Sequence, residues 1–170
     1  MATVFERIKE IYSMNQTSCR YSTISLRMFV EPERPHDSRV VLKGKAAEVK
    51  DLVLPLLQIW RDNMDGTCLA HKQIEMLLSR SARAEQILEE RRDDFVLRGA
   101  PYQEFRDNIE QYLLLLSALG RWHADRGQNL FTTTVKAHYM AHVAEAARHL
   151  SPRRSWCDCR WLCLASATFL

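Results

Sequence analysis

The feature that most constrains the fold is a repeated apolar spacing on both sides of Gly99 and Pro101. Apolar or small residues recur at intervals of four and three before this break, at Ala70, Ile74, Leu77, Ser81, Ala84, Leu88 and Phe95. The same spacing resumes after it, at Phe105, Ile109, Tyr112, Leu116 and Leu119. Such spacing places the residues on one face of an α-helix. We therefore expect helices over about 68–98 and 101–126, and the short connection makes them antiparallel.

The details of this hairpin predict its packing. Ser81 and Ala84 are small, so another helix can approach closely there. The run Leu113–Leu116 widens the apolar stripe of the second helix, which should be the most buried one. Gly99 suits the position after a helix, and Pro101 suits the first turn of the next. The other face of the first helix should be solvated, because both charge signs mix evenly over Arg80, Arg83, Glu85, Glu89, Glu90, Arg91, Arg92, Asp93 and Asp94.

The segments before the hairpin predict two more helices and one extended stretch. Residues 3–14 and 43–63 carry apolar residues at helical spacing. Pro55 lies inside the second of these, so a kink is expected near residues 51–54. Residues 22–30 alternate in polarity, which fits either a strand or an extended segment lying across helices. A polar loop with two prolines follows at 31–38.

The last helix should run over about 133–150, where Pro152 stops it. Its apolar face is predicted to comprise Tyr139, Met140, Val143, Ala146, Ala147 and Leu150. The expected fold class is all-α: an irregular four- to five-helix bundle built on a long antiparallel helical hairpin, with a short extended N-terminal segment. Residues 1–156 should form one helical domain, and the apolar, cysteine-rich tail 157–170 need not belong to the fold.

Charge and composition exclude some classes of protein. A net charge of +3 on 170 residues is too small to indicate a nucleic-acid binder. No apolar run reaches the length of a membrane span, so no membrane partner is expected. The N-terminus lacks the apolar core of a signal peptide, and the five cysteines are therefore expected to be reduced thiols in an intracellular compartment. Glycine-rich phosphate loops and nucleophile elbows are missing from the sequence.

The last predicted helix carries the strongest hint of chemistry. His138, His142, Glu145 and His149 fall at intervals of four, three and four along one stripe. Two histidines one turn apart can bind one metal ion, such as zinc, and a carboxylate one turn further on can be a third ligand. The glutamate of the zinc-protease motif is absent, since the segment reads His-Tyr-Met-Ala-His. The alternative is that these imidazoles border the core and form hydrogen bonds, and no cofactor is the default expectation.

Two further groups near the C-terminus could bind ligands. Cys157, Cys159 and Cys163 could supply thiolates with His149 as a fourth ligand, although their spacing differs from that of zinc knuckles and ribbons. Arg148, Arg153, Arg154 and Arg160 form a local basic excess. This basic group could contact the phosphates of a nucleic acid, or it could complement the dipole at the end of the last helix.

Several short motifs resemble those of a dinoflagellate protein family spread by mobile elements. They are Leu42–Glu48, Thr134–His142, and Ser151-Pro152-Arg153 followed by Trp156-Cys157. Their histidine and basic-aromatic order is also similar to that of the C-terminal part of En/Spm-type plant transposases. The resemblance covers about residues 3–157. It implies a helical piece of a transposase-like protein, and a nuclear location.

The departures from that family bear on catalysis. An acidic pair follows the Trp-Cys in the family, whereas Asp158-Cys159-Arg160-Trp161 follows here, which suggests a truncation. The upstream motif with Asp and His is also missing, and a nuclease-type transposase needs clustered carboxylates for two metal ions. The sequence therefore favours a non-catalytic fragment that contacts a protein partner or self-associates through helices. A metal-dependent hydrolase or metal-stabilised module at His138 and His142, and a weak nucleic-acid-binding module, remain the alternatives.

Overall fold

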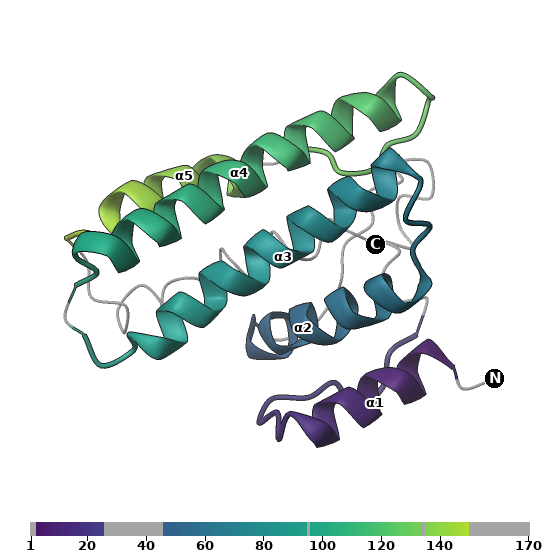
Figure 1. Cartoon of the computed structure of the whole chain (residues 1–170), viewed down its shortest axis with the longest axis horizontal. Helices are drawn as coiled ribbons and strands as arrows, with labels where there is room; N and C mark the ends of the chain where they lie inside the picture. Colours follow the sequence, from purple (N-terminus) through teal and green to yellow (C-terminus); the bar gives the residue numbers. More distant parts are fainter. Residues whose placement is uncertain (1–2, 26–45, 95, 134, 150–170) are drawn as a thin grey trace.

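The computed structural model describes residues 3–25, 46–94, 96–133 and 135–149. These residues form five α-helices and no strand, which confirms the all-α fold class. The helices are α1 (Val4–Met14), α2 (Ala46–Asn63), α3 (Leu69–Glu90), α4 (Gly99–Ala124) and α5 (Val135–Ala146). Each helix packs mainly against its neighbour in the chain, so that α3 lies between α2 and α4 (Figure 1).

The α3–α4 hairpin forms the main core, as the apolar spacing predicts. Leu77 and Ala84 of α3 are fully buried against Tyr112 and Leu119 of α4 in one hydrophobic cluster. Asn108 is also buried, and its side-chain amide donates to the Glu104 carbonyl oxygen at 2.7 Å. Burial of these large side chains against one another is the main favourable term for the hairpin.

The connection between α3 and α4 differs from the prediction of a helix to residue 98. α3 ends at Glu90, and the exposed residues 91–94 form a turn. Leu97 then enters the core, and its backbone N–H donates to the Ala147 carbonyl oxygen at 3.3 Å. A helix continued to residue 98 would keep Leu97 out of this position. Gly99 has φ +59° and is the first residue of α4, and so does not follow α3 directly.

The N-terminal part packs on the other side of α3. Thr3 and Glu6 form a reciprocal capping box at the start of α1, with hydrogen bonds of 2.8 and 3.2 Å. Ile8 and Tyr12 of α1 pack against Leu52 of α2 in a second cluster. α2 is continuous through Pro55 and ends at the predicted residue.

The prediction for α5 was right for its start, wrong for its end, and right in part for its apolar face. α5 ends at Ala146, and residues 147–149 form a turn. The predicted Tyr139 is 44% exposed, whereas Ala137 and Ala144 are buried against α4 together with the predicted Met140 and Ala147. Small side chains allow the two helices to approach closely, and this contact sets the rotation of α5.

Several predictions concern residues outside the described ranges. Within the extended segment predicted at 22–30, the described residues 22–25 form no strand. The remainder of that segment, the loop at 31–38 and the tail 157–170 lie outside the described residues.

Candidate functional site

An apolar groove lies where the second half of α2, the first half of α3 and the end of α4 meet. Its volume is about 750 Å³. Val4, the first residue of α1, lines it as well and is largely exposed. Most of its walls are aliphatic or aromatic, including Leu56, Ile59, Trp60, Ile74, Leu78 and Phe131. A concave, mostly apolar surface of this size is typical of ligand and peptide sites. We refer to it below as the apolar groove.

The turn between α2 and α3 fixes one wall of the apolar groove. The indole N–H of Trp60 donates to the carbonyl oxygen of His71 at 3.0 Å, and the two rings meet edge to face at 5.2 Å. The backbone N–H of Asp65 donates to Nδ1 of His71, also at 3.0 Å. These contacts hold Trp60 and His71 in place across the turn, so the wall is preorganised.

The end of α4 and the loop after it form the opposite wall. His123 is only 9% exposed, and its ring stacks on Phe131 with centroids 5.1 Å apart. Its Nδ1 lies 2.6 Å from Oε1 of Gln128. Since the amide oxygen can only accept, Nδ1 carries the proton, and in the neutral ring Nε2 is then an acceptor. Nε2 is buried and has no hydrogen-bond partner among the described residues.

A buried acceptor without a partner is costly in a folded protein. His123 lines the apolar groove, and its Nε2 is buried without a hydrogen-bond partner among the described residues. The groove therefore combines mostly apolar walls with a histidine whose Nε2 has no partner among the described residues. From the sequence alone, Trp122 and His123 near a helix end are expected to be packing residues, and His71 near a helix start is expected to be a surface residue. One feature of the sequence could have indicated the groove: Trp60 and His71 lie on either side of the turn that brings α2 against α3.

The predicted histidine stripe is exposed, and it lies on α5 and on the turn that follows this helix. His138, His142, Glu145 and His149 are all exposed. The Nε2 atoms of His138 and His142 lie 2.9 Å apart, with the ring planes at 90°. Glu145 forms an ion pair with Arg148 at 3.0 Å. Within the described ranges, no three His, Cys, Asp or Glu side chains are grouped so that they could hold a metal ion.

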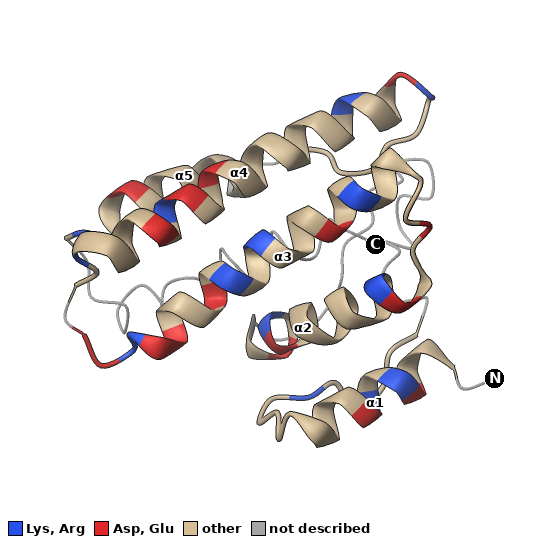
Figure 2. Cartoon of the chain, in the orientation of Figure 1, with Lys and Arg blue, Asp and Glu red and all other residues tan. Residues whose placement is uncertain are grey.

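The other predicted ligands lie mainly outside the described part of the chain. This applies to Cys157, Cys159 and Cys163, and to Arg153, Arg154 and Arg160 of the basic group. Arg148 is described, is exposed, and pairs with Glu145. Figure 2 shows red and blue residues interspersed along α3, which agrees with the mixed charge predicted for that helix.

Among the described helices, none is both long enough and apolar enough to cross a bilayer. Comparisons with protein-family models, with curated proteins and with solved structures found no match to this chain.

Proposed function

We propose that the chain is a helical protein-interaction scaffold, derived from a transposase-like mobile-element protein, that binds an apolar segment of a partner in the apolar groove. The observation that carries this proposal is the buried, unpartnered Nε2 of His123 in an otherwise apolar wall. Binding of this kind needs no catalytic group in the chain. The mobile-element origin, and a nuclear location with it, rest on the motifs that resemble the dinoflagellate family.

The dimensions and chemistry of the groove specify the kind of segment that fits. A volume of about 750 Å³ accommodates a few large side chains, the number that one face of a short amphipathic helix presents. The acceptor on His123 favours an anchor that is apolar but carries one donor. Tryptophan and tyrosine have this combination, and both are enriched at protein interfaces. The proposed partner is therefore an amphipathic helix with a tryptophan or tyrosine anchor.

A small probe tests this without knowledge of the partner. We expect indole, added to the full chain, to shift the amide NMR signals of residues around the groove. 1-Methylindole has a similar shape but no donor, and it should bind about fivefold or more weakly, because the acceptor on His123 then stays unsatisfied. Equal binding of the two probes, or shifts scattered over the whole surface, would refute the site.

Two matched variants distinguish binding of indole in the groove from binding elsewhere on the surface. Val4 and Val135 are each the first residue of a helix and are 62% and 70% exposed. A carboxylate at either position favours the helix dipole, so both variants should fold. We expect Val4→Asp to weaken indole binding several-fold and Val135→Asp to leave it unchanged, because only Val4 lines the groove. The same loss in both variants would count against the groove.

The 2.9 Å separation of the two Nε2 atoms favours a second candidate function, a metal-stabilised module at His138 and His142. Two nitrogens bound to one tetrahedral zinc ion are separated by about 3.4 Å, so a small rotation of the rings would be enough. Elemental analysis of the chain purified from zinc-supplemented medium tests it. The candidate requires zinc in the wild-type chain and its loss in the His138→Ala/His142→Ala variant. Equal zinc contents would end it.

A further inference from the structure

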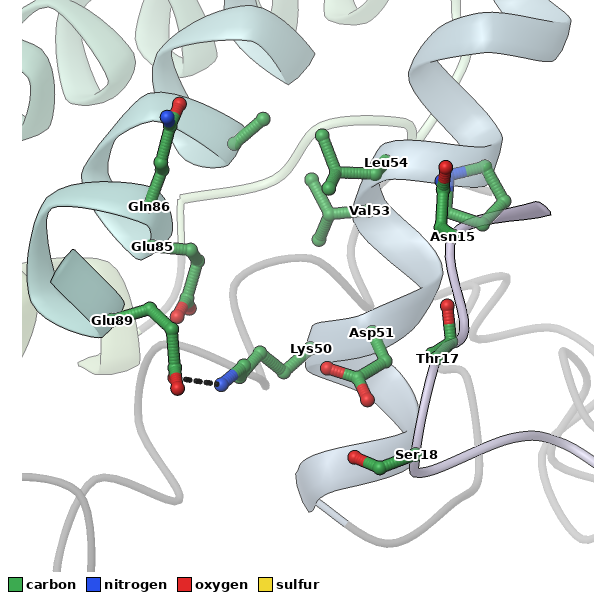
Figure 3. A pocket seen from close by; sticks show the side chains of 12 residues that line it. Asn15, Thr17, Ser18, Lys50, Asp51, Val53, Leu54, Glu85, Gln86 and Glu89 are labelled. Atoms are coloured by element: carbon green, nitrogen blue, oxygen red, sulfur yellow. Dashed lines mark hydrogen bonds and ion pairs between the residues drawn. The ribbon is translucent and has the colours of Figure 1, made fainter. Parts of the chain in front are cut away.

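A second cleft, separate from the apolar groove, lies between α2, the last turns of α3 and the loop after α1 (Figure 3). Its volume is about 350 Å³, and it shares no lining residue with the groove. One wall is apolar and includes Val53, Pro55 and Ala82. Of the described residues that line it, Asp51, Glu85 and Glu89 are acidic and Lys50 is basic. We refer to it below as the acidic cleft.

Glu85 is the unusual residue of the acidic cleft. The sequence predicts a solvated side chain, but Oε2 of Glu85 is buried and has no hydrogen-bond partner among the described residues. The position of Glu85 along α3 explains why its side chain is buried and not solvated. Glu85 lies three residues after the buried Ala82, on the stripe of α3 that packs against Val53 of α2. Figure 3 shows its carboxyl group pointing from α3 toward the side of the cleft where Lys50 lies.

The neighbouring charged groups are engaged with other partners. Nζ of Lys50 forms an ion pair with Oε2 of Glu89 at 3.2 Å. Oδ2 of Asp51 accepts a hydrogen bond from the backbone N–H of Cys19, also at 3.2 Å. Because Lys50 is paired with Glu89, the buried Oε2 of Glu85 on α3 has no partner among the described residues, and Asp51 lies across the cleft on α2. A buried carboxylate without a paired cation is costly, so a cation that pairs with it would bind favourably.

We propose that the acidic cleft binds a primary alkylammonium cation, whose ammonium group pairs with the carboxyl group of Glu85 and whose stem lies along Val53, Pro55 and Ala82. The Lys50–Glu89 pair shows the same pairing of ammonium and carboxylate in this cleft. A hydrated divalent cation would make no favourable contact with the apolar wall. The described residues also contain no group of three side chains that could bind such an ion. This inference does not depend on the function proposed for the apolar groove.

The cation should bind more tightly as the pH rises. Burial raises the pKa of Glu85 to about 7; the nearby carboxylates of Asp51 and Glu89 act in the same direction, and Lys50 opposes them. Of the described residues that line the cleft, these are the charged groups near Glu85: Lys50 and Asp51 on α2, and Glu89 one turn further along α3. Since only the ionised form pairs with an ammonium group, affinity should rise by about tenfold between pH 6 and pH 8.

The stability of the free chain should change with pH in the opposite direction to the affinity for the cation. Because the pKa of Glu85 in the folded chain is raised above its ordinary value, the folded state binds the extra proton. Stability of the free chain should therefore be highest below pH 4.5 as far as this group is concerned, and should fall as the pH rises through about 7. The Glu85→Gln variant should lack this decline. A bound alkylammonium ion should restore stability at pH 8.

The test is a calorimetric titration of the full chain with n-butylammonium chloride at pH 6 and pH 8, with n-butanol as the uncharged analogue. We expect binding of the amine at pH 8, at least tenfold weaker binding to Glu85→Gln, and unchanged binding to Glu90→Gln, an exposed carboxylate outside the cleft. Nα-acetyl-lysine methylamide carries the same ammonium group as part of a lysine residue. Comparing its affinity with that of n-butylammonium distinguishes a lysine side chain of a protein from a free amine as the ligand. Equal binding to Glu85→Gln and wild type, or butanol binding as tightly as the amine, would overturn the proposal.

Discussion

Replacing Phe105 with alanine is expected to lower the free energy of unfolding by about 3–5 kcal/mol. Phe105 is 1% exposed and lies in the main core cluster shared by α3, α4 and α5. The substitution removes the buried ring and leaves a cavity that the neighbouring helices can fill only in part. This loss is a large part of the roughly 5–15 kcal/mol that stabilises a typical domain. Urea unfolding, followed by far-ultraviolet circular dichroism, measures it.

Leu114 on the same helix provides the matched control. It is 71% exposed, and Leu114→Ala should change the free energy of unfolding by less than about 0.5 kcal/mol. Similar losses in the two variants would show that α4 is not buried as the structure has it. The comparison tests the rotation of α4 directly, because both positions belong to this helix but face in different directions.

Replacing Gly120 with alanine is expected to destabilise the chain by about 1–3 kcal/mol, although the same change in an exposed helix stabilises by up to about 1 kcal/mol. A Cβ atom at Gly120 would lie 2.6 Å from the backbone carbonyl oxygen of Phe131. The backbone at Phe131 cannot move aside as a flexible side chain can. The alanine variant must therefore separate α4 from the loop that carries Phe131. Phe131 also has φ +55°, a backbone conformation that this close packing holds in place.

The Gly120 variant also tests the apolar groove. Phe131 stacks on His123, so a displaced loop should weaken indole binding as well as stability. Gly66→Ala is the control, because a Cβ atom there meets nothing within 4 Å. It should alter neither the unfolding midpoint in urea nor the binding of indole. A stabilised Gly120→Ala chain would contradict the close approach of α4 and the loop.

The parts of the fold that sequence determined are those that depend on local pattern. The start of α1, the end of α2 and the buried stripe of the α3–α4 hairpin follow from apolar spacing and capping residues, which act over a few neighbouring positions. The turn that ends α3 at Glu90 could not be predicted in this way. It depends on the position that Leu97 takes against Ala147, a residue far along the chain.

The candidate sites were less predictable, because side chains from several helices form them. The sequence did place His138 and His142 one turn apart, and their rings are in contact. It did not distinguish Glu85 from the charged residues around it, since burial of that carboxyl group depends on where α2 packs. The unpartnered Nε2 of His123 likewise depends on the loop that returns over α4.

Sequence alone thus determined that the chain forms helices and which stripe of the central hairpin is buried. Tertiary structure decided the rotation of α5, the groove between α2 and α4, and the setting of Glu85. The physical reason is the separation along the sequence over which each interaction acts. Helical periodicity and capping act between residues three or four apart, whereas a groove or a buried charge depends on how separate helices pack.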